Sequence, residues 1–158
     1  MTAVSLRPAA PEDEQFLYSV YSVTMRDVIE QTWGWDEAWQ RAEFHRRFGR
    51  FNVSVIEAGS RAVGGLLLEE RPDSLYVHEL QIAPAFQGRG IGQEVVKMVI
   101  EQGARRGLPV TLSVVSANPR AKSLYERLGF RVTKVEPPFV RMRHDARSEE
   151  GGSCDYSF

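Results

Sequence analysis

The sequence contains a single cysteine, Cys154, so it can form neither an intrachain disulfide nor a zinc site built from several thiolates. No apolar run approaches the length of a bilayer crossing. The first residues, MTAVSLRPAAPEDE, lack the basic-then-apolar order of a signal peptide. Together these absences predict a cytoplasmic protein that does not associate with a membrane.

An excess of positive charge is also missing. The 20 Lys and Arg residues face 21 Asp and Glu residues, and the formal net charge is −1. Binding of nucleic acid through a broad basic face needs a clear Lys/Arg excess, so no nucleic-acid partner is expected. The length of 158 residues and a hydrophobic share of 42% suit one globular domain with a full core.

The periodicity of apolar residues changes several times along the chain. Helical spacing is expected over 11–31, from about 36 to 48, from about 90 to 106 and over 118–129. Strand patterns are expected at 4–9, 51–58, 61–70, 75–82 and 108–117, followed by two strands within 130–144 bent at Pro137 and Pro138. The resulting order, β-α-α-β-β-β-α-β-α-β-β, predicts an α+β fold: a mixed, twisted sheet of about seven strands with helices on both faces.

The end of the chain differs from the rest. Residues 145–158 show no periodicity, and we expect them to form a flexible tail behind a domain that spans 1–144.

The segment QGRGIG, residues 87–92, joins an expected strand to an expected helix. Bare backbone N–H groups at a helix N-terminus favour an anion, and glycine lets that anion approach closely. A phosphate-loop NTPase would need a Lys followed by Ser or Thr, which are absent. A dinucleotide fingerprint would need a third glycine at position 93, which is Gln, and an opening βαβ unit.

The pattern that does fit is Gln/Arg-x-x-Gly-x-Gly/Ala, with Gln87, Gly90 and Gly92 at its defined positions. About thirty residues later comes NPRAKSLYERLGF. With both segments at this spacing, the chain resembles the GCN5-related N-acetyltransferase (GNAT) family from SLRPA to FVRMRH, as a small bacterial-type member.

The resemblance implies that acetyl-coenzyme A (acetyl-CoA) is a co-substrate and that no metal is required. The loop would hold its pyrophosphate, Arg89 would add charge at the mouth, and the pantetheine arm would pair with the strand HELQIAP where it splays from TLSVVSA. The implied CoA-binding residues are Leu80, Gln81, Ile82, Gln87, Gly88, Arg89, Gly90, Ile91, Gly92 and Asn118.

The family pattern also implies a general acid at Tyr125, which would protonate the leaving sulfur. Ala121, Leu124, Tyr125 and Leu128 share one helical stripe, so a core aromatic is the structural alternative. The backbone N–H of Leu80 or Ile82 would polarise the thioester carbonyl.

The general base stays open between two neighbours. Ser113 stands where family members often carry an acid, so that route is in doubt. On the earlier strand, His78 and Glu79 point to opposite faces unless a bulge swaps them. A structural role is an alternative for both; Glu79 is favoured because a carboxylate can relay a proton through water.

Three tryptophans mark the region where the family places its acceptor site. Trp33, beside Gly34, is the candidate for lining a pocket, together with Trp35; core packing is the alternative for at least one of Trp35 and Trp39. The acidic Asp36, Glu37 and Glu43 either attract an amine or solvate a helix face. His45 and His144 lack partners at metal spacing.

The leading hypothesis is therefore an N-acetyltransferase that moves an acetyl group from acetyl-CoA to a primary amine by direct attack on the thioester. The amine belongs to a small molecule or a protein, and the enzyme is a monomer or a homodimer. A non-catalytic acyl-CoA binding or sensing module on the same fold is the alternative, and a nucleotide-binding protein of another fold is a third hypothesis.

Overall fold

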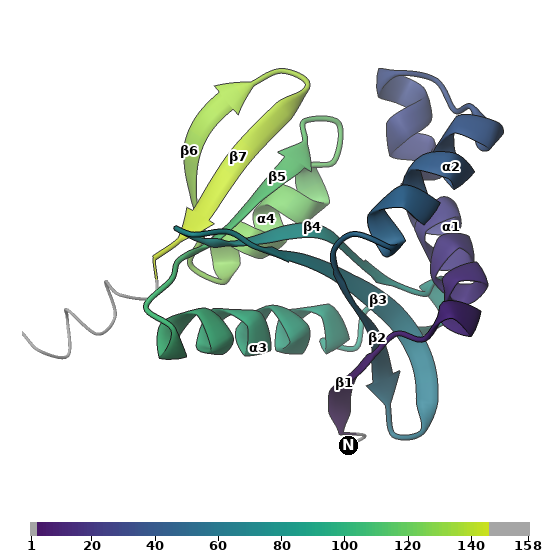
Figure 1. The fold of residues 1–158 in the computed structure, drawn as a ribbon. Helices are drawn as coiled ribbons and strands as arrows, with labels where there is room; N and C mark the ends of the chain where they lie inside the picture. Colours follow the sequence, from purple (N-terminus) through teal and green to yellow (C-terminus); the bar gives the residue numbers. More distant parts are fainter. Residues whose placement is uncertain (1–2, 146–158) are drawn as a thin grey trace, which may run out of the picture. The chain divides into compact units, whose positions relative to one another are not determined.

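The computed structural model describes residues 3–145. Its elements follow the expected order (Figure 1): β1 (Val4–Pro8), η1 (Pro11–Asp13), α1 (Glu14–Thr32), α2 (Glu37–Phe48), β2 (Asn52–Ala58), β3 (Arg61–Glu70), β4 (Leu75–Ile82), η2 (Pro84–Phe86), α3 (Ile91–Arg105), β5 (Val110–Val115), α4 (Pro119–Arg127), β6 (Arg131–Glu136) and β7 (Phe139–His144). The seven strands form one mixed sheet in the order β1-β2-β3-β4-β5-β7-β6, which confirms the predicted α+β class.

The chain divides into two compact units, and β4 and α3 each contribute residues to both. The first unit holds the described residues up to Glu69 together with His78–Val95. The second holds Glu70–Val77 and the described residues from Val96 onward. The predicted tail lies outside the described residues, apart from Asp145.

The first unit is built on an antiparallel meander. β1 pairs with β2 from Val4↔Ala58 to Pro8↔Ser54, and β2 pairs with β3 with a register shift between Ile56 and Glu57. A core of buried side chains joins α1, α2 and β2; its members are Leu17, Tyr18, Tyr21, Ile29, Phe44 and Val55. This core fixes the two helices whose inner side chains approach β4.

Local sequence explains where these helices begin. Pro11 opens η1, and the Asp13 carboxylate accepts a hydrogen bond from the Ala10 N–H at 2.7 Å. Asp36 caps α2 as predicted, because its Oδ1 accepts from the Trp39 N–H at 3.0 Å. The last turn of α2 carries His45, Arg46 and Arg47, which complement the negative end of the helix dipole.

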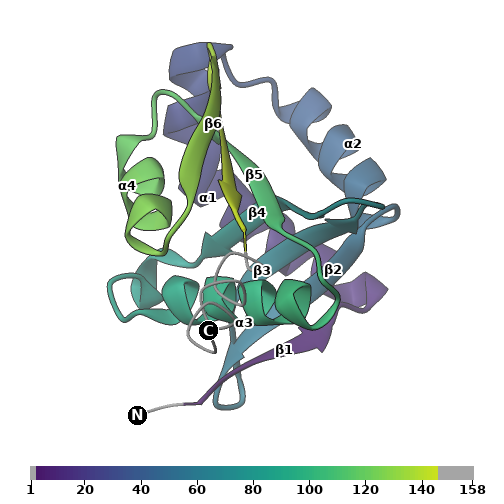
Figure 2. The same ribbon diagram turned by 90° about the vertical axis from the view of Figure 1, so that its left-hand side faces the viewer.

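The second unit contains a parallel pair and a hairpin. β4 pairs with β5 in parallel over Leu75–Val77, opposite Val110–Leu112. β5 pairs antiparallel with β7, and β7 pairs with β6 in the hairpin seen in Figure 2. The peptide bond between Pro137 and Pro138, at the predicted bend, is cis.

Helix ends in this unit also follow the sequence. Gly107 ends the α3 segment and Gly129 ends the α4 segment, both with a positive φ that glycine adopts without strain. Within the described residues, every helix is too short or too polar to cross a membrane.

Candidate active site

The loop between β4 and α3 is the predicted anion site, and it is exposed and turns at two glycines with positive φ. Gly88 and Gly90 have φ of +77° and +78°, and a Cβ built on either one meets no atom within 4 Å. Gln87–Gly90 are exposed, and the Gln87 amide anchors the loop by donating to the Ile82 carbonyl at 2.9 Å. The loop therefore presents bare backbone and open space at the start of α3, where N–H groups lack helical partners.

Two guanidinium groups lie beside this loop. The Cζ of Arg89 lies 5.3 Å from the centroid of the Phe86 ring, and the Cζ of Arg61 lies 5.1 Å from the same centroid. Arg61 opens β3 and is distant in sequence, so the motif gave no signal for it. Both arginines add positive charge near the loop.

The candidate base Glu79 is held by two other side chains. Its Oε2 accepts from Arg47 Nη1 at 2.7 Å, and its Oε1 accepts from Gln81 Nε2 at 2.7 Å. The side chains of Arg47 and Glu79 are only 14% and 13% exposed. Glu79 and Gln81 share a face of β4, as strand alternation predicts. Sequence reasoning missed Arg47, which lies on α2.

The surroundings keep Arg47 charged. Burial lowers the pKa of its guanidinium, but the charge and hydrogen bond of Glu79 outweigh burial and raise the pKa overall. The Tyr21 ring centroid lies 5.7 Å from the Arg47 Cζ. Burial, with the nearby Glu79 charge, raises the pKa of the Tyr21 phenol, so this hydroxyl stays protonated.

The other candidate base, His78, is engaged elsewhere. Its Nε2 lies 2.9 Å from Glu69 Oε1, and its ring stacks on Phe51 with centroids 4.1 Å apart and planes 17° apart. This arrangement gives His78 a packing role and a carboxylate partner. Which of His78 and Glu79 acts as a base stays a prediction.

The predicted pantetheine strand continues past the β4–β5 register to Ile82. Leu80 and Ile82 are half-buried, whereas Gln81 is buried. Ile91 is buried at the start of α3, where its side chain packs into the core. The contacts proposed for these residues with CoA stay predictions.

The two predicted residues of α4 belong to the second unit. Asn118 caps the helix, because its Oδ1 accepts from the Ala121 N–H at 3.3 Å. Tyr125 is half-buried, and its ring packs edge-on against Phe130 at 5.3 Å between centroids. Tyr125 is therefore not a fully buried core residue.

Ser113 replaces the acid that family members often carry. Its Oγ accepts from the Tyr76 hydroxyl at 3.0 Å and from Arg141 Nη1 at 3.0 Å. Ser113 therefore presents a neutral, hydrogen-bonded hydroxyl in the second unit.

The three tryptophans differ in exposure. Trp33 is 54% exposed and Trp39 is 59% exposed, whereas Trp35 packs against the core of the first unit. Core packing is therefore confirmed for Trp35, whose Nε1 also donates to Glu37 Oε1 at 3.0 Å. Trp33 keeps the exposure that a pocket wall requires.

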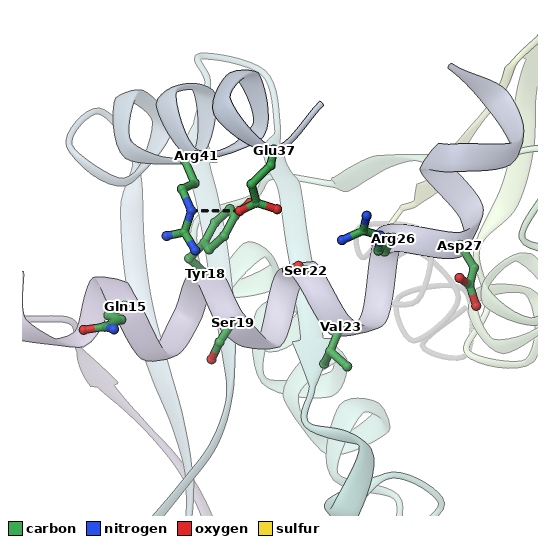
Figure 3. A pocket seen from close by; sticks show the side chains of 9 residues that line it. All are labelled: Gln15, Tyr18, Ser19, Ser22, Val23, Arg26, Asp27, Glu37 and Arg41. Carbon is green, nitrogen blue, oxygen red and sulfur yellow. Dashed lines mark hydrogen bonds and ion pairs between the residues drawn. The ribbon is translucent and has the colours of Figure 1, made fainter. Parts of the chain in front are cut away.

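A groove of about 580 Å³ lies along α1 beside the first turns of α2 (Figure 3). Its lining residues are Gln15, Tyr18, Ser19, Ser22, Val23, Arg26, Asp27, Glu37 and Arg41. The Tyr18 hydroxyl donates to Glu37 at 2.8 Å; burial, together with that carboxylate, raises the pKa of Tyr18 to about 12. Of the residues considered from the sequence, only Glu37, one of the acidic candidates for attracting an amine, lines this groove; the candidate catalytic, CoA-binding and tryptophan residues do not. Among residues 3–145, no cluster of His, Cys, Asp and Glu has the size of a metal site.

Known proteins share the family and the fold of this chain. The model of the acetyltransferase (GNAT) family matches residues 15–130. The chain therefore belongs to the GNAT acetyltransferase family, and the predicted resemblance is confirmed. The N-alpha-acetyltransferase RimI of Mycobacterium tuberculosis is 32% identical over 115 residues, which cover 68% of this chain and 70% of RimI.

Matches to other proteins cover different shares of their lengths. An uncharacterised N-acetyltransferase of Methanocaldococcus jannaschii, MJ1207, is 35% identical over 96 residues, covering 56% of this chain but 42% of the relative. Among solved structures, the PaiA N-acetyltransferase of Thermoplasma acidophilum, in complex with coenzyme A, has a TM-score of 0.70 at 16% identity, covering 90% of this chain and 99% of that one. YncA of Salmonella typhimurium, solved with acetyl-CoA, has a TM-score of 0.62 at 19% identity and covers 92% and 95%. These two structures share the fold.

Proposed function

We propose that this protein is an acetyl-CoA-dependent N-acetyltransferase that acetylates a primary amine by direct attack on the thioester. The observation that carries the proposal is the β4–α3 loop, where Gly88 and Gly90 adopt positive φ and leave open space. Family membership supports it, and so do the two structures of the same fold that hold coenzyme A or acetyl-CoA.

In the proposed reaction, the loop N–H groups of residues 87–92 bind the pyrophosphate, with Arg89 adding charge. Leu80 and Ile82 present backbone groups to the pantetheine arm and to the thioester carbonyl, and Asn118 contacts the arm. The bound co-substrate supplies an activated acetyl group.

The proposed chemistry needs one bond formed and one broken. The amine nitrogen attacks the carbonyl carbon, and the carbon–sulfur bond then breaks. The nitrogen loses a proton to Glu79, directly or through water, and the departing thiolate takes a proton from Tyr125. No covalent intermediate on the protein is required.

The acceptor is proposed to be a primary amine whose site is lined by the exposed side chain of Trp33, whereas Trp35 packs against the core of the first unit. Relatives carry names that specify different acceptors: L-2,4-diaminobutyric acid in Nocardia farcinica and thialysine in Bos taurus. With the N-alpha-acetyltransferase RimI, these names define an amine panel of diaminobutyrate, thialysine and short peptides with free N-termini.

A non-catalytic acyl-CoA binding module is the second candidate, and one observation favours it. Both oxygens of Glu79 already accept hydrogen bonds, and His78 already has Glu69 as a partner. Release of free thiol from acetyl-CoA, measured against the amine panel, separates the two functions. Amine-dependent release supports the enzyme, whereas coenzyme A binding without release on any amine supports the module.

Thermal shift tests the co-substrate itself. We expect coenzyme A to raise the melting temperature and ATP and NAD to leave it unchanged, because stabilisation follows specific binding to the native state. A shift with ATP or NAD and none with coenzyme A would contradict the proposal.

A further inference from the structure

Arg47 is a largely buried cation that contacts Glu79, a proposed catalytic side chain. We propose that Arg47 is a positioning residue for Glu79: it fixes the orientation of this carboxylate in the acetyl-transfer reaction. The inference rests on the proposed function, which gives Glu79 the acceptor proton. Arg47 Nη1 lies 2.7 Å from Glu79 Oε2, across 32 residues of sequence.

The carboxylate is held at both oxygens from two different elements. Arg47 reaches it from α2, and Gln81, on β4 itself, donates to the other oxygen at 2.7 Å. Each carboxylate oxygen offers about two acceptor sites, so each keeps room for one further donor. Glu79 can therefore accept a hydrogen bond from an amine or a water molecule while its orientation stays fixed.

Arg47 is in turn fixed by buried neighbours. The Tyr21 ring lies against its guanidinium, and the Tyr21 hydroxyl donates to Gln40 Oε1 at 2.8 Å. Tyr21 and Gln40 are 4% and 5% exposed. Arg47 Nε finds no hydrogen-bond partner in the part of the chain that the structure describes, and lies 3.8 Å from Glu43 Oε2. The Arg47 guanidinium thus lies between Glu79 and a buried, hydrogen-bonded pair, Tyr21 and Gln40.

Stability alone is a weak reason for such a pair. Desolvation offsets most of the attraction within a buried ion pair, and apolar residues of similar volume often stabilise a protein as well or better. The neighbouring Arg46, by contrast, pairs with Glu43 on the helix surface and is 53% exposed. Its substitution changes the charge of the same helix turn without reaching β4.

The experiment compares Arg47→Met, Arg47→Lys, Glu79→Gln, and each Arg47 variant combined with Glu79→Gln, with Arg46→Met as the matched control. The probes are acetyl-CoA and the amine of the panel that gives the highest turnover. We expect Arg47→Met to lower kcat about 10- to 100-fold with an unchanged KM for acetyl-CoA, because misplacement of a catalytic group acts on the chemical step. Arg47→Lys should keep part of kcat, and Arg46→Met should match the wild type.

The double variants test whether Arg47 acts through Glu79. If Arg47 acts through Glu79, adding Arg47→Met to Glu79→Gln lowers kcat no further. If the kcat losses of the single variants multiply in the double variant, the inference about Arg47 is wrong. A wild-type kcat in folded Arg47→Met has the same meaning. Either result leaves the proposed function standing. If Arg47→Met does not fold, the same comparison is made with Arg47→Lys. A wild-type chain that turns over no amine overturns the proposed function and this inference with it.

Discussion

Gly64 of β3 lies directly against the backbone of Gln81 in β4. A Cβ atom built on Gly64 would overlap the Gln81 carbonyl oxygen and come within 3.2 Å of the Ile82 Cα. The atoms in the way are main chain, so no side-chain rotation can relieve the contact. This close approach fixes β4 at the position that carries Glu79 and leads into the glycine loop.

We therefore expect Gly64→Ala to destabilise the protein by about 1–3 kcal/mol, the usual cost of overpacking a filled interior. Chemical denaturation measures it. Gly49→Ala is the control, because a Cβ there meets only ordinary contacts at 3.8 and 3.9 Å. Equal stability of the two variants would show that β3 and β4 can move apart freely.

The helices and strands could be predicted from the sequence because their signals are local. Strand patterns in the sequence predicted β2 to β4, Asp36 predicted the start of α2, and Gly107 and Gly129 predicted two helix ends. The glycine loop was found for the same reason, since its motif is contiguous. Its positive φ values at Gly88 and Gly90 agree with the expected need for glycine.

The surroundings of the candidate base could not be predicted, because they depend on long-range packing. Arg47 meets Glu79 across 32 residues, and its helix carries Arg41, Arg46 and Arg47 with no pattern that singles one out. Arg61 reaches Phe86 beside the loop in the same way. Only the packing of α2 and β3 against β4 and the loop decides which arginine is buried or stacked.

Substitution of two glycines of the loop should affect coenzyme A binding differently. Gly90→Ala should weaken coenzyme A binding about 10-fold or more, because a Cβ would occupy the open space assigned to the pyrophosphate. Gly92→Ala should bind normally, since Gly92 lacks a positive φ and its Cβ would meet Ile82 at an ordinary 3.7 Å. Titration calorimetry measures both affinities.

The backbone strain that Gly90→Ala introduces needs its own control, because Gly90 has a positive φ. Gly107→Ala imposes similar strain at φ +68°, in the segment that ends α3. We expect it to lower stability as Gly90→Ala does but to leave coenzyme A affinity unchanged. Unchanged affinity in folded Gly90→Ala would remove the loop from the proposed site.

The ion pair between Arg7 and Asp13, at the start of α1, should make the stability of the protein depend on pH. Hydrogen bonds from Arg7, then that from the Ala10 N–H, lower the pKa of Asp13 below its usual 3.8. A lowered native pKa stabilises the fold above the unfolded-state value, and this contribution is lost as the pH falls through the native value. Asp13→Asn should therefore have a lower melting temperature than the wild type at pH 7, and the difference should narrow as the pH falls below 3.8. A difference that stays constant with pH would contradict the charge-based account.

A substitution of Tyr125 can distinguish a catalytic role of this residue from a packing role. Tyr125→Phe keeps the ring that packs on Phe130 and removes only the hydroxyl. We expect kcat to fall on the order of 10²-fold, the contribution typical of a general acid, with coenzyme A affinity nearly unchanged. Phe130→Leu is the packing control and should affect stability more than kcat. A wild-type kcat in Tyr125→Phe, with chemistry rate-limiting, would assign Tyr125 to packing.

The last prediction decides between Glu79 and His78. An acceptor ammonium must lose a proton before its nitrogen can attack, so a base matters most where little free amine exists in solution. If Glu79 takes this proton, Glu79→Gln should lower kcat/KM for the amine at neutral pH by about 10²-fold. The loss should shrink as the pH rises, because solvent then supplies the free amine. Affinity for acetyl-CoA should not change.

His78→Gln tests the neighbour under the same conditions. It removes the ring that stacks on Phe51 but keeps a polar group near Glu69, so we expect lower stability and a pH–rate profile like that of the wild type. The reverse result, a pH-dependent loss in His78→Gln and none in Glu79→Gln, would transfer the role to His78. If neither substitution changes the profile, the free amine itself is the substrate and no dedicated base exists. The contacts of Arg47 and Gln81 hold the Glu79 carboxylate in one orientation, which is the arrangement that the positioning proposal requires.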